Sequence, residues 1–407
     1  MTRIRLIAAS LSVGAGVMLG AVSCSAAAAS KTAARADDGK DDLAVLQADI
    51  DRLSAAGGGV LQLEAGTYDL SMPLYLRSGV QVRGRGDATI LSNKRLSQRY
   101  GWFGTTVFAG NLTPASYSDE DGRGYPGKPV RRLSSTEVEI AKCDPAKVGG
   151  LGNRVVWLSS SEYIRGSRSR VINPVWGEMN LVARASGCRV TLTDPIQIPS
   201  GENLQIHWSD GSRALPGGHE PNAPIRAAGL DSLQLESNQG QAMVATGCYR
   251  CTFTNLRIGQ SRRLLMVQGM RHTVYRNISG MFTEKGIEIT KYATDNVVEK
   301  IDGQHRPTAD ATLRPALRVA EYARRNQVRD VQMRLGAAYE GKTKIRFDAS
   351  SDTKVERVKL FLDRQDRSPG LLYVPPEGAR GPGGRLPPGT TLNDVQLCVG
   401  GSCVAVD

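Results

Sequence analysis

The stretch Gly229-Leu230-Asp231-Ser232-Leu233-Gln234-Leu235 opens a segment, ending near Val399, in which one short phrase recurs seven times. Each copy is four residues long. Its first and fourth positions are apolar, and its third position is often Asn, Asp or a basic residue. The copies are Leu230–Leu233, Phe253–Leu256, Tyr275–Ile278, Val298–Ile301, Val328–Val331, Val355–Val358 and Leu392–Val395. Successive third positions lie 22 to 37 residues apart. Self-similarity on this scale predicts a solenoid, in which each unit needs its neighbours to bury its apolar side.

Alternating runs rich in Val, Ile, Leu and Phe surround each copy, which is typical of β-strands. A tight corner between two strands needs a residue that tolerates a left-handed backbone, and Asn255, Asn277, Asp330 and Asp394 meet that need. A second row of short strands precedes the corners: Leu265-x-Val267, Ile287-x-Ile289, Leu317-x-Val319, Ile345-x-Phe347 and Leu372-x-Val374. Two rows in step predict a coil of strands stacked on itself, which is a parallel β-helix.

The N-terminus has the pattern of a secretory signal, because two early arginines precede an apolar run from Leu6 to about Val22 and small residues follow. Two cleavage interpretations stay open. The sequence before Cys24 resembles a bacterial lipoprotein box, in which Cys24 would be lipidated, and the alanine run after it offers cleavage near residue 27. An uncleaved membrane anchor is a third interpretation. We therefore expect export, as a secreted, periplasmic or envelope-anchored bacterial protein that contacts the membrane only through such an anchor.

The cysteine count fits an oxidising compartment. Removing Cys24 from the seven cysteines leaves six, an even number. We expect a local disulfide between Cys398 and Cys403 that pins the tail. Cys143 with Cys188 and Cys248 with Cys251 are weaker pairing hypotheses. Zinc binding is disfavoured, because no His or further CxxC lies at ligand spacing.

Residues 41 to 56 predict an amphipathic helix that Asp41 or Asp42 caps, with Leu46, Ile50 and Leu53 on one face. Short strands are expected at 60–63, 68–70, 74–76, 80–82 and 89–91. A helix before the first coil would cover the open end of the solenoid, since an uncovered sheet edge invites aggregation.

This entry region carries a family resemblance. Its signature elements are Asp37-Asp-Gly-Lys-Asp-Asp42, Gly57-Gly-Gly59, Leu63-x-x-Gly66-x-Tyr68, Ser78-Gly79-Val80 and Arg83-Gly84-x-Gly86. Residues 36 to 92 thus resemble the entry segment of the pectate-lyase-like superfamily. The resemblance implies an all-β protein, a right-handed parallel β-helix, from a polysaccharide-active family. It implies little about chemistry, because the same segment precedes lyases, hydrolases, epimerases and phage tail proteins.

Residues 136 to 208 break the coil period. Strand-like runs at 155–158, 179–183, 189–192 and 204–206 predict a small inserted antiparallel β-module. The expected domains are a capping helix and first coils with a long loop at 36–135, the module at 136–208, and coils with a C-terminal tail at 225–407. The module could wall a substrate cleft, and a spacer or a subunit contact is the alternative.

The formal net charge of +12 attracts polyanions. Nucleic acid is disfavoured, because aromatic residues are few and no nucleic-acid motif is present. An acidic polysaccharide fits better as partner, and solubility alone is the alternative explanation of the charge. The sequence does not predict an oligomeric state.

The strand row before the corners should expose one column of side chains, because alternate residues of a strand face outward. The column is Met266, Glu288, Arg318, Arg346 and Tyr373, and a neighbouring column is Gln268, Thr290, Ala320 and Asp348. Arg318 and Arg346 would then stand side by side, and like charges opposed on a sheet are destabilising. Either a uronate carboxylate bridges them, or Glu288 and Asp348 neutralise them.

The lyases that this fold resembles pair the substrate carboxylate with a cation and remove the neighbouring proton with a basic side chain. An arginine can do so only where neighbours disfavour its charged form, and clustered Arg318, Arg346 and Lys291 are the candidates. Calcium, if used, needs several oxygen ligands. Glu288, Asp348 and Glu321 are candidates, although no compact acidic cluster is visible.

Four further residues are candidates for the site. His305 lies in the expected loop 302–310 and could act as a general acid or base, or simply be solvated. Trp102, Tyr163 and Tyr373 could stack on sugar rings, although packing of the 93–135 loop is the alternative for Trp102.

Three function hypotheses follow: a lyase that cleaves an acidic glycan by β-elimination, a hydrolase that uses Glu288 and Asp348, and a non-catalytic glycan binder or adhesin. The catalytic motifs of polygalacturonases and alginate epimerases are absent, so no family's catalytic residues transfer.

Overall fold

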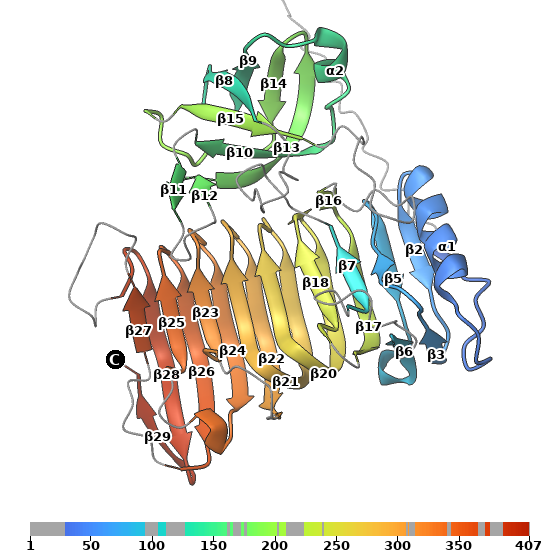
Figure 1. Ribbon diagram of the computed structural model, residues 1–407, viewed down its shortest axis with the longest axis vertical. Coiled ribbons are helices and arrows are strands. Elements are labelled where there is room, and N and C mark those ends of the chain that lie inside the picture. The colour runs from blue at the N-terminus through green and yellow to red at the C-terminus, as the bar shows by residue number, and fades with distance from the viewer. Residues whose placement is uncertain are drawn as a thin grey trace, which may run out of the picture.

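The computed structural model describes residues 29–93, 105–110, 127–160, 163–165, 172–174, 177–201, 203–208, 224–237, 240–306, 308, 314–339, 343–364, 371–374 and 386–406. The predictions for Cys24, Trp102 and the signal segment 1–27 lie outside these residues. No helix within the described ranges is both long and apolar enough to cross a bilayer. The described chain forms a long solenoid of β-strands with a small β-barrel above it (Figure 1).

The solenoid begins with β1 (Ala29–Lys31), α1 (Leu43–Ala55), β2 (Gly59–Gln62), β3 (Gly66–Asp69), β4 (Leu74–Tyr75), β5 (Val80–Arg83), β6 (Thr89–Ser92) and β7 (Val107–Ala109). It continues with β16 (Ile225–Arg226), β17 (Gly229–Glu236), β18 (Met243–Thr246), β19 (Cys248–Tyr249), β20 (Thr252–Gln268), β21 (Val274–Thr290) and β22 (Val297–His305). It ends with β23 (Leu317–Ala320), β24 (Gln327–Arg334), β25 (Ile345–Asp348), β26 (Lys354–Leu362), β27 (Leu371–Val374), β28 (Thr391–Val399) and β29 (Ser402–Ala405).

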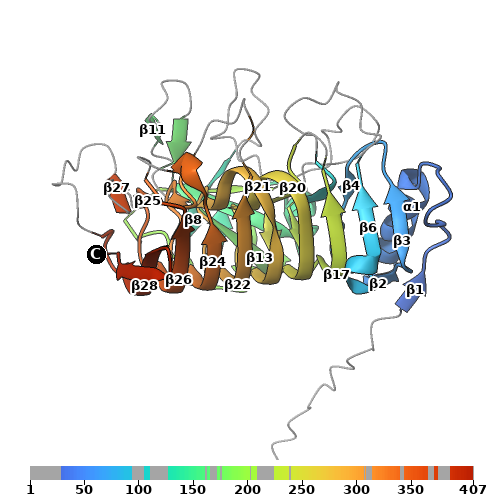
Figure 2. The same cartoon turned by 90° about the horizontal axis from the view of Figure 1, so that it is seen from below.

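The seven copies of the phrase stack in register. Their first residues pair from β17 through β20, β21, β22, β24 and β26 to β28, all in parallel. All seven third positions have a positive φ, between 50° and 55°. These are Ser232, Asn255, Asn277, Lys300, Asp330, Arg357 and Asp394. The predicted left-handed corner is therefore confirmed, and it extends to residue types that adopt it less readily. Figure 2 shows these strands side by side along the solenoid.

Helix α1 lies at the N-terminal end of the solenoid and buries Leu46, Ile50 and Leu53 against its core (Figure 1). Asp42 occupies the N-cap position, but its carboxylate accepts a hydrogen bond from the Asp69 amide at 3.0 Å. Asp41 accepts instead from the Leu43 amide. The start of the helix is thereby tied to the first coil.

The inserted antiparallel module folds as a closed six-stranded barrel. Its strands are β8 (Lys128–Arg132), β9 (Glu137–Ile140), β10 (Val155–Ser160), β13 (Gly177–Ser186), β14 (Arg189–Leu192) and β15 (Leu204–His207), with helix α2 (Pro145–Gly149) and the ribbon β11 (Tyr163–Arg165) and β12 (Ile172–Pro174) attached. Strands β8 and β9 were not predicted. After the barrel the solenoid continues from the coil that preceded the insertion. Strand β17 pairs with β5 on one side, before the barrel in the chain, and with β20 on the other.

A buried cluster joins the barrel to the solenoid. Trp157 and Met179 of the barrel pack against Tyr249 and Tyr292 of the solenoid. Arg271, which is 2 % exposed, donates to the Met179 carbonyl at 2.8 Å. These contacts fix the barrel over one row of solenoid turns.

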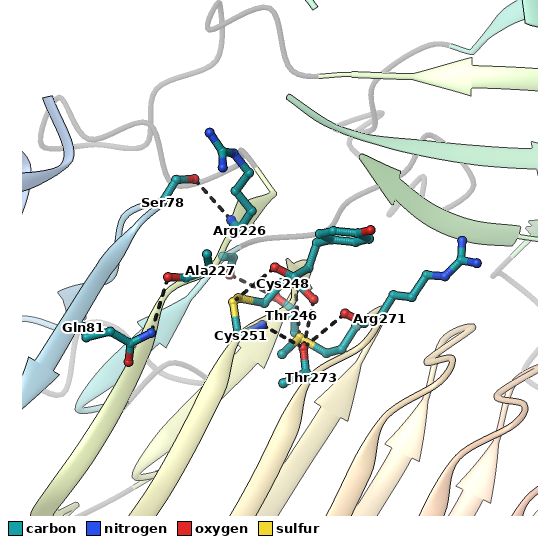
Figure 3. The surroundings of a disulfide bond; sticks show 12 residues. Ser78, Gln81, Arg226, Ala227, Thr246, Cys248, Cys251, Arg271 and Thr273 are labelled. Atoms are coloured by element: carbon teal, nitrogen blue, oxygen red, sulfur yellow. Dashed lines mark hydrogen bonds between the residues drawn. A yellow bond between two sulfur atoms is a disulfide. The ribbon is translucent and has the colours of Figure 1, made fainter. Parts of the chain in front are cut away.

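The predicted Cys398–Cys403 disulfide is present, and Cys143–Cys188 and Cys248–Cys251 are also bonded. Figure 3 shows the Cys248–Cys251 bond at the turn between β19 and β20. The Thr273 hydroxyl donates to the Cys248 carbonyl at 3.2 Å, which ties this turn to the next coil. The turn also presents Tyr249 toward the barrel.

Candidate functional site

The predicted column of side chains forms on the strand row that runs toward the barrel, but the expected exposure is wrong for its first two members, because Met266 and Glu288 are buried. Glu288 of β21 pairs with Arg318 of β23, and Arg318 pairs with Arg346 of β25. The column then continues to Leu372, because Arg346 pairs with Leu372. The prediction that Tyr373 belongs to this column is wrong by one residue: Tyr373 pairs with Phe347 in the next row.

Arg318 is the centre of the column. Its Nη1 lies 2.9 Å from Glu288 Oε1, and its Nε lies 3.0 Å from Asp348 Oδ2. A third carboxylate, that of Glu321, lies 3.8 Å from Nη2. Of the two arrangements predicted for the adjacent arginines, the neutralised one is therefore present, with Arg318 clamped between acids on both sides.

Arg346 completes the row. Its Nε lies 2.8 Å from Asp348 Oδ1, and its side chain remains 38 % exposed. Asp348 thus bridges the two neighbouring arginines, while the Arg346 side chain stays partly on the surface.

Glu288 is surrounded by cations at the buried side of the column. Lys285 Nζ lies 2.6 Å and Arg263 Nε 3.3 Å from its carboxylate, in addition to Arg318. Burial raises the pKa of Glu288, but Arg263, Lys285 and Arg318 outweigh burial and lower it to about 2. Glu288 is therefore a permanent anion at neutral pH.

Sequence reasoning missed Arg263 and Lys285. They pair with each other across β20 and β21, directly after an irregularity in the register between Ser261 and Arg263. Such an irregularity breaks the alternation of inward-facing and outward-facing residues. Alternation along the sequence therefore cannot predict which way the side chains of Arg263 and Lys285 face. The only available signal was the three-residue spacing of Lys285 and Glu288.

The two lysines near the column have lowered pKa values. Burial is the main cause for Lys285, and the neighbouring Arg263 and Arg318 add to it, so that its pKa falls to about 8 despite the ion pair with Glu288. Burial also lowers the pKa of Lys291, against the opposing effect of Glu321 and Glu288. Lys291 lies in the turn after β21, at a positive φ of 55°.

The surroundings of Arg318 oppose the role of a base that the sequence suggested for it. Burial disfavours its charge, but Glu321, Glu288 and Asp348 more than compensate and raise its pKa above the ordinary value. Removal of a proton from this guanidinium is thus harder than from a free arginine, because three carboxylates hold the cation.

His305 is not in a loop. It is the last residue of β22, is 5 % exposed, and its two ring nitrogens face the backbone carbonyls of Leu335 and Thr283 at 3.0 and 3.1 Å. Burial lowers its pKa. It lies in a different strand row from Arg318, so the structure does not bring it to the column.

The remaining candidates are placed only in part. Tyr163 begins β11 and Tyr373 lies in β27, but their side chains are outside the described part of the chain. No group of three or more His, Cys, Asp or Glu residues among the described residues could hold a metal ion. The proposed calcium ligands Glu288, Asp348 and Glu321 face Arg318 instead, so they do not fit a calcium site.

A second charged row provides a contrast. Arg276, Glu299, Arg329 and Glu356 pair in that order across β21, β22, β24 and β26, so that charges alternate along the coils. Glu299 contacts both arginines. This row is balanced, whereas the column and the charged side chains around it together combine five cations with three carboxylates. The cations are Arg263, Lys285, Lys291, Arg318 and Arg346, and the carboxylates are Glu288, Glu321 and Asp348.

Comparison with known proteins gives remote likenesses only. No family model and no curated protein matches the chain. The tailspike of Pseudomonas phage phi297 is 12 % identical, with a TM-score of 0.39, over 88 % of this chain and 69 % of its own. The Streptococcus pneumoniae surface protein and adhesin PfbA is 9 % identical, with a TM-score of 0.42, over 86 % and 72 %. A tailspike variant of E. coli bacteriophage HK620 in complex with a pentasaccharide is 10 % identical, with a TM-score of 0.37, over 90 % and 54 %. The resemblance to the pectate-lyase-like superfamily therefore stays a prediction.

Proposed function

We propose that this protein is exported and binds an acidic, uronate-containing polysaccharide along the column of Glu288, Arg318 and Arg346. The observation that carries the proposal is the excess of two formal positive charges in the column and the charged side chains around it. Within this group two arginines stand side by side on consecutive coils. Three disulfides support export to an oxidising compartment.

The geometry favours binding of anions for a simple reason. Arg318 is held in place by buried or half-buried acids, so its guanidinium is already oriented before a ligand arrives. Among the described residues Arg346 has one acidic partner, and its side chain is 38 % exposed, so a carboxylate can reach it without breaking the whole cluster. Preorganised charges of this kind lose little entropy on binding.

Hydrolysis by Glu288 and Asp348 has less support. A glycosidase needs one carboxylic acid that holds its proton near neutral pH. Glu288, with a pKa of about 2, has lost its proton, and Asp348 is engaged by both arginines.

A second candidate function is β-elimination on the same polysaccharide. The observation that favours it is Lys285, whose pKa of about 8 makes it a far better base than an arginine. In this alternative Arg346 pairs with the substrate carboxylate and the lysine removes the adjacent proton.

The test measures affinity for polygalacturonate at low and high ionic strength. We expect Arg346→Ala to weaken binding about fivefold at low salt, with a smaller difference at high salt. The matched control is Arg329→Ala in the balanced row, since the Arg329 side chain is 36 % exposed and also contacts a carboxylate.

Equal losses in the two variants would mean that net charge alone attracts the polymer, and no binding by the wild type would refute the proposal. The same samples are read for the ultraviolet absorbance of an unsaturated uronate. Absorbance that disappears in Lys285→Ala, while binding persists, would establish the elimination.

A further inference from the structure

We propose that two copies of this protein associate edge to edge through strand β29, about a two-fold axis that passes beside Val404. Strand β29 lies at the end of the solenoid opposite helix α1 (Figure 1). It pairs antiparallel with β28, and all four of its residues are exposed. The proposal is independent of the charged column, which lies on other strands.

The backbone of β29 has an open edge. Strand β28 pairs with β26 on one side and with β29 on the other, and no further strand pairs with β29 in the described part of the chain. The Val406 amide donates to the Val395 carbonyl at 2.9 Å. Hydrogen-bonded and non-hydrogen-bonded pairs alternate along an antiparallel ladder. The N–H and C=O groups of Cys403 and Ala405 therefore point away from β28, toward the open edge.

This edge is fixed in place before any partner arrives. The Cys398–Cys403 disulfide cross-links β28 and β29 at a directly opposed pair, with Cα atoms 4.0 Å apart. A strand held in this way loses little conformational freedom when it pairs. Proteins commonly protect a free edge with a lysine, a proline or a bulge. The sequence of β29, Ser402 to Ala405, has no lysine or proline, and its register with β28 is unbroken.

The middle of the edge carries an exposed apolar side chain. Val404 is 64 % exposed. Among the described residues the other large apolar side chain that is exposed is Val45 of helix α1, at 38 %. A neighbouring strand would cover Val404, which no residue of the described chain does.

One register satisfies both the backbone and this valine. When β29 of a second copy runs antiparallel, Cys403 of each copy can lie opposite Ala405 of the other, so that all the outward N–H and C=O groups of these residues are paired. Val404 then lies opposite Val404 of the second copy in a non-hydrogen-bonded pair, with Cβ atoms about 4.5 to 5.5 Å apart. A single two-fold axis therefore produces both contacts.

The distribution of charge favours a second copy as the partner. Two copies with a formal net charge of +12 repel each other. Residues 395 to 406, however, contain no charged residue, so pairing of this edge with itself places no like charges opposite each other. The pairing of two four-residue strands covers less area than the roughly 1,000 Å² of a stable interface. We therefore expect a weak, reversible dimer.

The experiment is sedimentation equilibrium of the protein between about 1 μM and about 1 mM. We expect a dimer with a Kd on the order of 100 μM. Val404→Lys should raise this Kd at least about tenfold, because like charges then lie opposite each other. The matched control is Val45→Lys, which adds the same charge at the other exposed apolar side chain and should associate as the wild type does.

A mixture of Val404→Lys and Val404→Glu tests the two-fold axis itself. Association should return in the mixture, because opposite charges then face each other across the axis. If Val404→Lys fails to fold, Val404→Glu alone carries the same expectation of a tenfold weaker dimer. A wild type that stays monomeric up to 1 mM would overturn the proposal. So would a Val404→Lys variant that dimerises like the wild type, or a mixture that does not recover association.

Discussion

At the scale of single residues, the site depends on the small number of carboxylates that contact a larger number of basic side chains. Glu288 alone faces Arg263, Lys285 and Arg318, and it is only 2 % exposed. A carboxylate in such surroundings is stabilised as an anion, although burial opposes the charge. The two arginines of the column stay side by side because Asp348 and Glu288 offset their repulsion.

The lowered pKa of Glu288 predicts a stability change in acid. Its pKa is about 2 in the folded protein and near 4.5 when unfolded, so its contribution is fully present above about pH 4.5 and is lost as the pH falls through 2. Between about pH 6 and about pH 3 we expect about 2 kcal/mol of this contribution to disappear. Denaturant unfolding of the wild type and of Glu288→Gln at both pH values measures it.

Glu288→Gln should be less stable near neutral pH and should lack this part of the pH dependence. Glu356→Gln in the balanced row serves as control and should keep the wild-type slope. A variant Glu288→Gln that follows the wild-type curve at every pH would show that the cations around Glu288 do not stabilise its charge.

At the scale of elements, the recurring corner organises the coils. Seven third positions share a left-handed backbone, but only Asn255, Asn277, Asp330 and Asp394 are residue types that tolerate it well. The side-chain amide of Asn277 donates a hydrogen bond to the side-chain oxygen of Asn255 at 2.7 Å, so neighbouring corners are also linked by hydrogen bonds. The phrase therefore encodes both the bend and part of the contact between coils.

The corner at Lys300 predicts a stabilising substitution. Lys300 is exposed and has a φ of 55°, which costs a lysine more than an asparagine. Lys300→Asn should raise the free energy of unfolding by about 0.5 to 1 kcal/mol, and chemical denaturation measures the gain. Lys359→Asn is the control within strand β26, where asparagine is disfavoured and no gain is expected.

At the scale of the whole molecule, the barrel is held to the solenoid by a buried ionic network. Asp194 of the barrel accepts from the Tyr249 hydroxyl at 2.8 Å and contacts His272 at 3.0 Å and Arg271 at 3.5 Å. Burial raises the pKa of Asp194, but these partners outweigh burial and lower it to about 2. Glu178, which is fully buried, lies 3.3 Å from Arg324.

Breaking this network should loosen the barrel while the solenoid stays folded. Asp194→Ala removes one acid from a buried set of partners, which costs about 3 kcal/mol. We expect amide hydrogen exchange at barrel residues beside the interface, such as Met179, to accelerate roughly 100-fold, with no change at solenoid residues such as Ile278.

The control is Asp302→Ala, because the pair of Asp302 with Arg334 is exposed on both sides and contributes little. Unchanged exchange at Met179 in Asp194→Ala would show that the apolar contacts of Trp157 hold the barrel by themselves. Faster exchange throughout the molecule would mean that barrel and solenoid unfold together.

The repeat, the corners and most strands could be predicted from the sequence, because each depends on residues close together in the chain: an apolar pair, a residue that tolerates positive φ, and alternation with a period of two. It also placed Glu288, Arg318, Arg346 and Asp348 together, since regular coils preserve that period. Other features depend on which distant segments come together in the folded molecule, and local patterns do not specify those contacts. They are the register irregularity before Arg263, the shift that moves Tyr373 out of the column, the closure of the barrel, and the packing of Tyr292 between Trp157 and Tyr322.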